Sequence, residues 1–450
     1  MFKLTQLLTV LFLSSITNAQ SLKVFDVKDF GAVGDGVTND QVAIQKAINE
    51  CAGTGGTVVF KEGKFLTGQL VLGSDMNLAI AESATILGMM SDEESVYPHH
   101  LIETVYPNRM LQDCQRRLIY GNHVENVTIF GKGTIDGQGF YEPWMNVKEL
   151  GTEKDRPSIL AFVGSKNIQV AGIRMINPAC WTQVYIECDS VVISGVYVHT
   201  GNLTPNRDGI DIVDCHNVLI ENCDISSEDD GICFKSGSEF GVKNVVVKDC
   251  KIDKLNVRAG NCFKLGTDGL GSFMNFQVSG LEMKNAYQNS AITIESMDGA
   301  VIDNLNFEEC TISNCGQAFF LLLADRKRTV PGRNPRIGSI SNINFKNITG
   351  DNFTQQYPSI ITGVKGHNIQ NVSFENVHLN LKGGISETNQ TVMEYDGKYP
   401  EGSYFGNTNA HGFFIRHTDD VKFTNCSFTT EIKDAREWLI TENVKSVSVK

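Results

Sequence analysis

The chain has 450 residues, of which 41% are hydrophobic and 20% charged, and its formal net charge at pH 7 is -13. Non-specific nucleic-acid binding requires a basic surface, so this charge argues against it. The charge also offers no general attraction to an anionic polymer, so any recognition of such a polymer must be local.

Residues 1–19 are typical of an export signal. Lys3 provides a positive charge, residues 7–13 form an apolar core, and Thr17-Asn18-Ala19 offers small residues before an expected cleavage after Ala19. The apolar run is too short to span a membrane, and no later stretch is suited to it. We therefore expect an exported protein, secreted or periplasmic, with one domain over residues 20–450.

A capping helix is predicted close to the N-terminus. Thr38-Asn39-Asp40 is expected to begin an amphipathic helix that continues through Ala52, with Thr38 or Asn39 as its N-cap. Its predicted apolar stripe consists of Val42, Ile44, Ala47 and Ile48. Such a helix would cover the open strand edges at one end of a stacked fold.

One phrase then recurs along the chain: Asn, apolar, any residue, apolar, any residue, followed by Gly, Asn or Asp. Copies include KNIQVAGIRM from Lys166, HNVLIENCDI from His216 and KNVVVKDCKI from Lys243, and between Lys166 and Asp303 the copies begin 23 to 31 residues apart. The alternation predicts a strand, a corner and a second strand. Units this short must stack to bury their apolar faces, and a propeller would need longer units with hairpin turns. We expect an all-β, single-stranded right-handed parallel β-helix of about ten coils.

Four of the 12 cysteines occupy the same slot of this phrase: Cys223, Cys250, Cys310 and Cys426. An even number of cysteines in an exported protein is compatible with disulfides. The repeated slot favours small buried thiols stacked in the core.

Acidic residues at two corners suggest chemistry. Asp208 lies 21 residues before Asp229 and 22 before Asp230, which is close to one coil. Stacked strands are about 4.7–4.9 Å apart, so the fold would gather these three carboxyl groups. Crowding keeps at least one of them protonated, and a protonated acid beside an ionised one suits glycoside hydrolysis. The alternatives are a metal site or a solvated acidic turn.

At these residues the sequence resembles the family 28 glycoside hydrolases, the polygalacturonase-like enzymes of the pectin-degrading β-helix superfamily. The resemblance is carried by Asn206-Arg207-Asp208, by Asp229-Asp230, and by FGAVGDG at residues 30–36 with GGTVVF at residues 55–60. It implies an inverting hydrolysis in which Asp229 is the general acid while Asp208 and Asp230 hold and deprotonate a water molecule. We expect no metal and no cofactor, and a polysaccharide or oligosaccharide as substrate.

The sequence departs from the family at its substrate-binding motifs. Asn261 stands where a His is usual, and Thr293 and Glu295 stand where an Arg-x-Lys motif would hold a uronate carboxylate. Glu295 suits sugar hydroxyls better, so a neutral residue such as rhamnose or galactose is expected there. Rhamnogalacturonan or a substituted or oligomeric galacturonan is therefore favoured over plain polygalacturonan.

The expected substrate-binding residues are Asn206, Lys235, Asn261, Lys264, Glu295 and Arg326. Lys235 and Lys264 are interpreted as occupying equivalent places on successive coils, where they would form either a cationic ladder for an acidic sugar or a solvated strand edge. Arg326 could line the cleft or belong to a solvated loop. Trp144 and Trp181 are candidates for sugar stacking or for buried packing. Arg258 aligns with Asp229 one coil on, and the two could form a pair.

Two other functions remain open. A polysaccharide lyase on the same fold would need a Lys or Arg base and usually Ca²⁺, which the aspartates could bind. A non-catalytic carbohydrate-binding β-helix would have no need of stacked carboxyl groups. Residues 385–410 interrupt the repeat and are predicted to form a long loop, which could extend over the cleft. The protein is expected to be a monomer without a membrane span.

Overall fold

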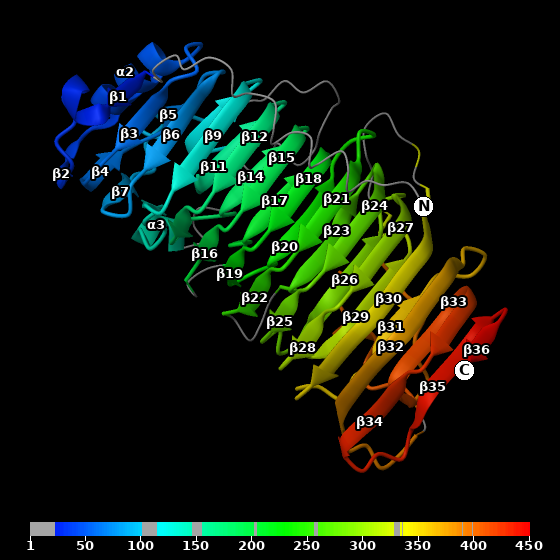
Figure 1. Ribbon diagram of the computed structural model, residues 1–450. Helices are drawn as coiled ribbons and strands as arrows, with labels where there is room; N and C mark the ends of the chain where they lie inside the picture. The colour runs from blue at the N-terminus through cyan, green and yellow to red at the C-terminus, as the bar shows by residue number, and fades with distance from the viewer. Residues whose placement is uncertain are drawn as a thin grey trace.

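The repeated phrase forms strands that pair in parallel with the equivalent strand of the next coil. Val218, for example, lies opposite Val191 of the preceding coil and Val245 of the following one. The apolar positions of successive coils therefore stack into columns that fill the interior. The computed structural model, which describes residues 23–100, 115–145, 155–201, 205–255, 260–327, 334, 336–388, 390–397 and 399–450, is a long right-handed parallel β-helix (Figure 1). The fold prediction is confirmed.

Three parallel sheets run along the β-helix, and the sheet that carries the aspartates is named the cleft sheet. It consists of β5 (Leu70–Val71), β8 (Arg117–Asn122), β11 (Ser158–Val163), β14 (Gln183–Ile186), β17 (Ile210–Val213), β20 (Ile232–Ser236), β23 (Phe263–Gly269), β26 (Ser290–Ser296), β29 (Gln317–Leu323), β31 (Ser359–Thr362), β33 (Ala410–Thr424) and β35 (Glu437–Val444).

The other two sheets complete each coil. One contains β1 (Val24–Asp26), β3 (Thr57–Phe60), β6 (Met76–Ile80), β9 (Glu125–Gly131), β12 (Lys166–Ala171), β15 (Asp189–Ser194), β18 (His216–Glu221), β21 (Val242–Lys248), β24 (Ser272–Ser279), β27 (Val301–Glu308), the first parts of β30 (Ser339–Asp351) and β32 (Ile369–Gly383), the last part of β33, and β36 (Val447–Val449). The other contains β2 (Asp35–Asn39), β4 (Gly63–Thr67), β7 (Ala84–Gly88), β10 (Thr134–Asp136), β13 (Arg174–Ile176), β16 (Tyr197–His199), β19 (Asp224–Ser227), β22 (Lys251–Lys254), β25 (Glu282–Lys284), β28 (Thr311–Ser313), the last parts of β30 and β32, and β34 (Ser427–Ile432).

Asparagines make the corners of the coils. They adopt the left-handed conformation that Asn tolerates better than most residues, with φ of 57° at Asn217, 58° at Asn244 and 62° at Asn275. Their side chains also bond from coil to coil: Asn244 donates to Asn217 at 3.1 Å, and Asn275 donates to Asn244 at 3.0 Å. These two properties account for the Asn that recurs in the phrase.

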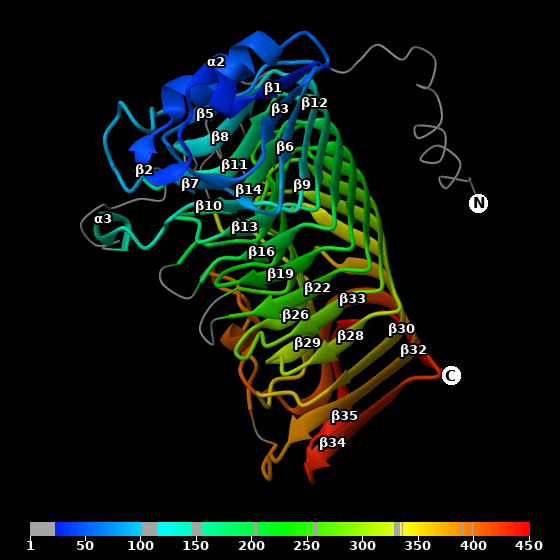
Figure 2. The ribbon, with the colours of Figure 1, turned by 60° about the vertical axis from the view of Figure 1, so that its left-hand side comes forward.

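The predicted capping helix is α2 (Gln41–Cys51), which covers the first coil (Figure 2). Two details of the prediction are wrong. Asp40 is the N-cap residue, and its carboxylate accepts hydrogen bonds from the backbone of the preceding loop instead of capping the helix. Val42 is 81% exposed, because a residue two positions before Ile44 lies on the opposite side of the helix. Cys51, one turn after Ile48, completes the buried stripe instead.

The other helical segments of the described residues are short: η1 (Val27–Phe30), α3 (Glu142–Met145) and η4 (Gly402–Phe405). Among the described residues, no helix is long and apolar enough to cross a bilayer. The predicted export signal and Arg258 lie outside the described residues.

The cysteine prediction is confirmed for the phrase slot. Cys223, Cys250 and Cys310 are buried thiols and Cys426 is a partly buried one, each without a disulfide. Each sulfur lies 3.2–3.3 Å from the backbone carbonyl oxygen two residues earlier. Trp144 is completely buried against Tyr97 and Tyr141, so it packs in the core and offers no exposed face to a sugar.

Candidate active site

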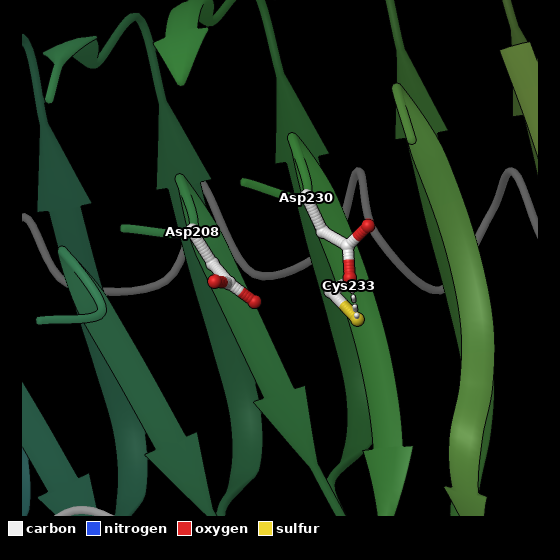
Figure 3. Close-up of side chains that lie close together, drawn as sticks. All are labelled: Asp208, Asp230 and Cys233. Carbon is white, nitrogen blue, oxygen red and sulfur yellow. Dashed lines mark hydrogen bonds between the residues drawn. The ribbon is translucent and has the colours of Figure 1, made fainter. Parts of the chain in front are cut away.

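The fold brings Asp208 and Asp230 to the same place on adjacent coils, just before β17 and β20. Ile210 pairs with Ile232, so the two aspartates, each two residues earlier, are in register. Carboxylate oxygens of both residues lie within 4.8 Å of one another and of the sulfur of Cys233 (Figure 3). The glycine after each aspartate permits this close stacking, because a Cβ at Gly209 would lie 2.5 Å from the carbonyl oxygen of Gly231.

Asp229 has a different environment from its two neighbours. Its side chain is partly exposed, whereas Asp208 and Asp230 are each only 3% exposed. One oxygen accepts a hydrogen bond from the backbone N–H of Asn206 at 3.2 Å, and the other accepts one from the N–H of Asp230 at 2.9 Å. The carboxyl group is thus held at the corner with an open side toward solvent.

Lys235 compensates the charge around Asp208. Its ammonium group donates to Asp208 at 3.0 Å and also to Asp211, and it lies 4.3 Å from the centre of the ring of Trp181. Burial raises the pKa of Asp208 well above its usual range, and the charge of Asp211 adds to this effect while Lys235 opposes it. Burial likewise raises the pKa of Asp211 to about 6 against the opposing charge of Lys235.

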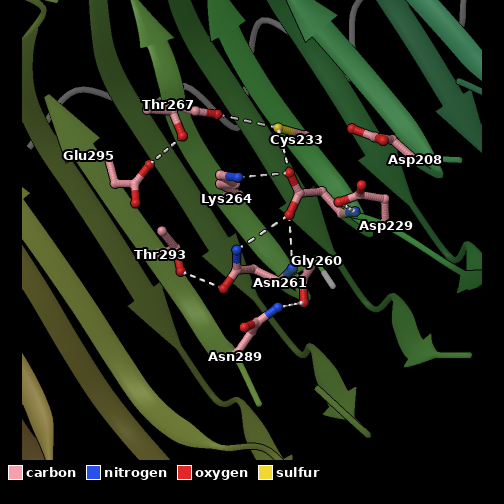
Figure 4. A network of polar contacts seen from close by, with 12 residues as sticks. Asp208, Asp229, Cys233, Gly260, Asn261, Lys264, Thr267, Asn289, Thr293 and Glu295 are labelled. Carbon is pink, nitrogen blue, oxygen red and sulfur yellow. Dashed lines mark hydrogen bonds and ion pairs between the residues drawn. The ribbon is translucent and has the colours of Figure 1, made fainter. Parts of the chain in front are cut away.

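Around Asp230, nearby positive charges outweigh the effect of burial on the pKa. Its burial would raise the pKa, but the nearby charges of Lys264 and Lys235 and the N–H of Asn261 lower it to about 2. The ammonium group of Lys264 lies 3.0 Å from one oxygen, and the N–H of Asn261 donates to the other at 2.8 Å (Figure 4). Asp230 is therefore ionised over the ordinary pH range, while Asp208 resists ionisation.

The predicted equivalence of the two lysines is wrong. Lys264 lies opposite Cys233, whereas Lys235 lies opposite Val213 and two residues further along the strand. The register follows the buried pair Ile232 and Phe263, which the repeated phrase alone does not specify. Lys235 consequently binds Asp208 and Asp211, Lys264 binds Asp230, and the two lysines do not form a continuous cationic ladder.

Asn261 and Thr293 extend the polar network to the next coil. The side-chain oxygen of Asn261 accepts hydrogen bonds from the hydroxyl of Thr293 at 2.9 Å and from the N–H of Ser290 at 3.0 Å. Its amide group lies 3.4 Å from Asp230. Asn261 therefore orients Asp230 from the position where the family resemblance places a histidine.

Glu295 is completely buried in the same sheet. It accepts a hydrogen bond from the hydroxyl of Thr267 at 2.8 Å, and its other oxygen has no partner. Burial raises its pKa to about 8, against the opposing charge of Lys264. Glu295 is thus a protonated carboxyl group at neutral pH.

A pocket of about 330 Å³ opens beside Asp229. Its described lining consists of Asp229, Gly260, Lys264, Gln288, Asn289, Tyr357, Tyr399, Glu401 and Ser403. The last three belong to the described part of residues 385–410, which is named the covering segment. It packs on the outer face of the cleft sheet through an apolar cluster with Phe320, Leu322, Ile360 and Phe414. The loop predicted to extend over the cleft thus supplies one wall of the pocket.

The other predicted binding residues have structural partners. Arg326 lies near the far ends of β23 and β26, where it is bound to Asp298 and to Asp268, the latter at 2.7 Å. The side chain of Asn206 accepts a hydrogen bond from Arg156 at 3.3 Å. Trp181 is 5% exposed, with Lys235 over its ring. Neither Arg326 nor Glu295 is among the described residues that line the pocket.

Several site residues were missed in the sequence. Asp211 lies on the outward face of β17, opposite Cys233 of the next coil. The available signal in the sequence was the similarity of residues 208–211 to residues 230–233, which gives Asp211 and Cys233 the same place. Lys254 is buried beneath this corner, where its ammonium group donates to the hydroxyl of Ser227 at 2.9 Å. Tyr399 and Glu401 come from the segment without repeats, so the sequence carried no signal for them.

The cluster of Asp208, Asp230 and Cys233 is a poor site for Ca²⁺. Calcium takes six to eight oxygen ligands, whereas this cluster offers two carboxylates and a sulfur atom, and burial raises the pKa of the Cys233 thiol well above its usual range. Two lysine ammonium groups already contact the carboxylates at 3.0 Å. Each of these two carboxylates therefore already has a cationic partner within the chain.

A parallel β-helix with three carboxyl groups on adjacent corners beside an open pocket defines a carbohydrate-cleaving protein of the solenoid type. Residues 101–397 match the sequence profile of Glycosyl hydrolases family 28, and residues 24–88 match that of Rhamnogalacturonase A/epimerase, pectate lyase-like. The chain belongs to glycosyl hydrolase family 28 and is a polygalacturonase-like glycosidase. This family membership favours hydrolysis over the lyase and the non-catalytic alternatives.

Individual relatives agree with this assignment. The chain is 24% identical over 383 residues to a probable polygalacturonase of Vitis vinifera, covering 82% of this chain and 77% of that protein. It is 25% identical over 354 residues to endo-xylogalacturonan hydrolase A of Aspergillus tubingensis, covering 74% and 80%. The fold is similar to that of the family 28 exopolygalacturonase of Yersinia enterocolitica, with a TM-score of 0.69, 21% identity, and coverage of 94% of this chain and 78% of the other.

Proposed function

We propose that the chain hydrolyses an α-glycosidic bond of a pectin-type glycan with inversion of configuration. Asp229 acts as the general acid, and Asp208 and Asp230 hold and deprotonate the attacking water. The observation that carries this proposal is the contrast among the three carboxyl groups. Two are buried in register with pKa values displaced in opposite directions, and the third faces the pocket.

Hydrolysis requires one proton for the leaving oxygen and removes one proton from the attacking water. The carboxyl proton of Asp229 moves to the glycosidic oxygen as its bond to the anomeric carbon breaks. A water molecule between Asp208 and Asp230 attacks that carbon from the opposite face and loses a proton to one of the two carboxylates. Asp208 suits this acceptor role in its ionised form, because its raised pKa makes it the stronger base of the two and one of its oxygens has no hydrogen-bond partner among the described residues.

Charge supports a substrate with a neutral sugar near the cleaved bond. The pocket is lined by Asp229, Glu401 and Lys264, and Lys264 is already paired with Asp230. Among the described lining residues, a uronate carboxylate would meet no uncommitted cation, in keeping with Thr293 and Glu295 in the places of the family's basic motif. We therefore favour rhamnogalacturonan, or a substituted or oligomeric galacturonan, over plain polygalacturonan.

The proposed substrate also favours a location for the protein outside the cell. Pectin-type polymers are too large to enter a cell, so a protein that cleaves them is best exported, as residues 1–19 predict. All three proposed catalytic groups come from one chain, so we propose that the monomer is the active unit.

Product analysis with Asp229→Asn tests the proposal. The purified protein is incubated with polygalacturonan, rhamnogalacturonan and xylogalacturonan while reducing ends, anomeric configuration and ultraviolet absorbance are followed. We expect new reducing ends of inverted configuration without ultraviolet absorbance, and a loss of about 10²–10⁴-fold in kcat for the variant. Asp249→Asn is the matched control, because Asp249 is an exposed corner residue with φ of 54°. Unsaturated products, or full activity of Asp229→Asn, would contradict the proposal.

A further inference from the structure

The covering segment places two side chains at the pocket that no sequence motif indicates. Tyr399 is 61% exposed although it lies in the middle of this segment, and Glu401 lies two residues later. Both line the same pocket as Asp229. The face of an exposed aromatic ring on a pocket wall beside the acid is suited to contact with the apolar face of a sugar ring.

The position of Tyr399 is set by its hydroxyl group. That oxygen lies 3.3 Å from the ammonium group of Lys264 and 3.3 Å from the hydroxyl of Thr267. Thr267 in turn donates to the buried Glu295. The ring is therefore anchored to the cleft sheet at one end, while most of its surface remains available to a ligand.

The segment that presents these side chains is itself fixed. Arg416 of β33 is 2% exposed and donates to the carbonyl oxygens of Val392 at 3.0 Å and Met393 at 2.9 Å. Phe405 is buried in the cluster on the outer face of the cleft sheet. Anchoring on both sides of Tyr399 and Glu401 holds the pocket wall in place before a ligand binds, which lowers the entropic cost of binding.

Three polar side chains on the pocket wall have no hydrogen-bond partner in the described part of the chain: Gln288, Tyr357 and Glu401. An amide, a phenol and a carboxyl group together can both donate to and accept from hydroxyl groups. A neutral sugar presents such hydroxyl groups on every side. The volume of about 330 Å³ is at the lower end of the range for small-molecule sites, roughly 300–1,000 Å³.

We propose that Tyr399 and Glu401 are specificity-determining residues that form the subsite next to Asp229 and bind a neutral sugar residue there. Tyr399 stacks against the sugar ring, and Glu401 hydrogen-bonds its hydroxyl groups. Glu401 thus takes the role that sequence analysis gave to Glu295, which is buried behind Thr267. The inference deepens the proposed function and rests on it for the identity of the reaction.

The test compares two substrates in several variants. One substrate is a rhamnogalacturonan oligosaccharide, which can place a neutral rhamnose in the subsite. The other is an oligogalacturonate of similar length, which can place only a charged galacturonate there. We expect wild type to prefer the rhamnogalacturonan oligosaccharide. Tyr399→Ala should raise KM for it about tenfold, and Glu401→Gln should lower its kcat/KM about tenfold while leaving turnover of the oligogalacturonate unchanged or improved. Glu387→Gln, an exposed glutamate of the same segment, is the control and should match wild type.

Failure of this inference differs from failure of the proposed function. Equal changes on both substrates, no change in either variant, or a wild-type preference for oligogalacturonate would overturn the subsite assignment while hydrolysis stands. If no glycan is turned over, calorimetric binding of the rhamnogalacturonan oligosaccharide to Asp229→Asn still tests the subsite. Binding that weakens about tenfold when Tyr399→Ala is added supports it, and unchanged or absent binding overturns it.

Discussion

Two identical side chains in equivalent positions can have different pKa values, because each has different charged and hydrogen-bonding partners. Asp208 and Asp230 are both aspartates, both buried, and in register on adjacent coils. Asp208 shares one lysine with Asp211, so burial dominates and its pKa rises. Asp230 has Lys264 and a backbone N–H to itself, so its pKa falls to about 2. The proposed roles of the two aspartates therefore depend on Asp211, Lys235 and Lys264 as much as on the aspartates themselves.

Glu295 should make the free energy of unfolding of this protein depend on pH. An ordinary glutamate ionises near 4.5, whereas the pKa of Glu295 in the fold is about 8. Below pH 4.5 the carboxyl is protonated in both the folded and the unfolded chain. Between about 4.5 and 8 only the unfolded chain loses the proton, so the free energy of unfolding decreases as the pH rises through this window. Glu295→Gln should therefore flatten the decrease.

Urea unfolding at about pH 5 and about pH 8 measures this effect. Asp211, with a pKa of about 6, and Glu401, with a pKa of about 7, contribute in the same direction, so a smaller decrease will persist in the variant. Glu387→Gln serves as an exposed control and should keep the wild-type slope. An unchanged slope in Glu295→Gln would show that Glu295 is ionised in the folded chain.

At the scale of strands and segments, the sequence predicted what the repeat governs. Alternation identified the strands, and the Asn slot identified the corners, because both depend on residues close together in the chain. The register between neighbouring coils was harder to predict from the sequence. The offset between Lys235 and Lys264 depends on which buried residues pair, a property of two coils at once. Tyr399 and Glu401 could not be predicted, because their segment follows no repeat and reaches the site across several coils.

The covering segment should behave as a separately held element. Arg416 joins it to the cleft sheet through two hydrogen bonds to backbone carbonyls and an ion pair with Glu394 at 3.7 Å. Removing these bonds with Arg416→Met should lower the free energy of local opening by about 1–3 kcal/mol. We expect faster amide hydrogen exchange across residues 392–405 and a higher KM, with little change in kcat.

The control for this prediction is Arg174→Met. Arg174 is an exposed arginine of β13 that lies over the ring of Tyr197. Both residues belong to a sheet other than the cleft sheet. Its loss should leave exchange in residues 392–405 unchanged. Exchange that accelerates equally throughout the β-helix in Arg416→Met would mean that the arginine stabilises the whole fold and does not hold the segment alone.

At the scale of the whole molecule, stability is a property of neighbouring coils. Each coil contacts mainly the one before and the one after it, as the pairing of every sheet demonstrates. In such a fold, a local defect spreads only as far as the coupling between coils carries it. The site coils around β17 and β20 lie in the middle of the stack, with paired neighbours on both sides (Figure 1).

The aromatic column in the last coils allows this coupling to be measured. Phe374 is 1% exposed, and its ring centre lies 5.0 Å from that of Phe345 and 4.9 Å from those of Phe413 and Phe423. Phe374→Ala should cost about 3–5 kcal/mol, because it leaves a cavity among these rings. Hydrogen exchange followed by mass spectrometry should show lost protection from β30 to β36 and wild-type protection from β9 to β20. Phe130→Ala, at a side chain that is 39% exposed, should alter neither region. Uniform loss of protection along the chain in Phe374→Ala would show instead that the β-helix unfolds as one cooperative unit, and the site coils would then share every defect of the C-terminal ones.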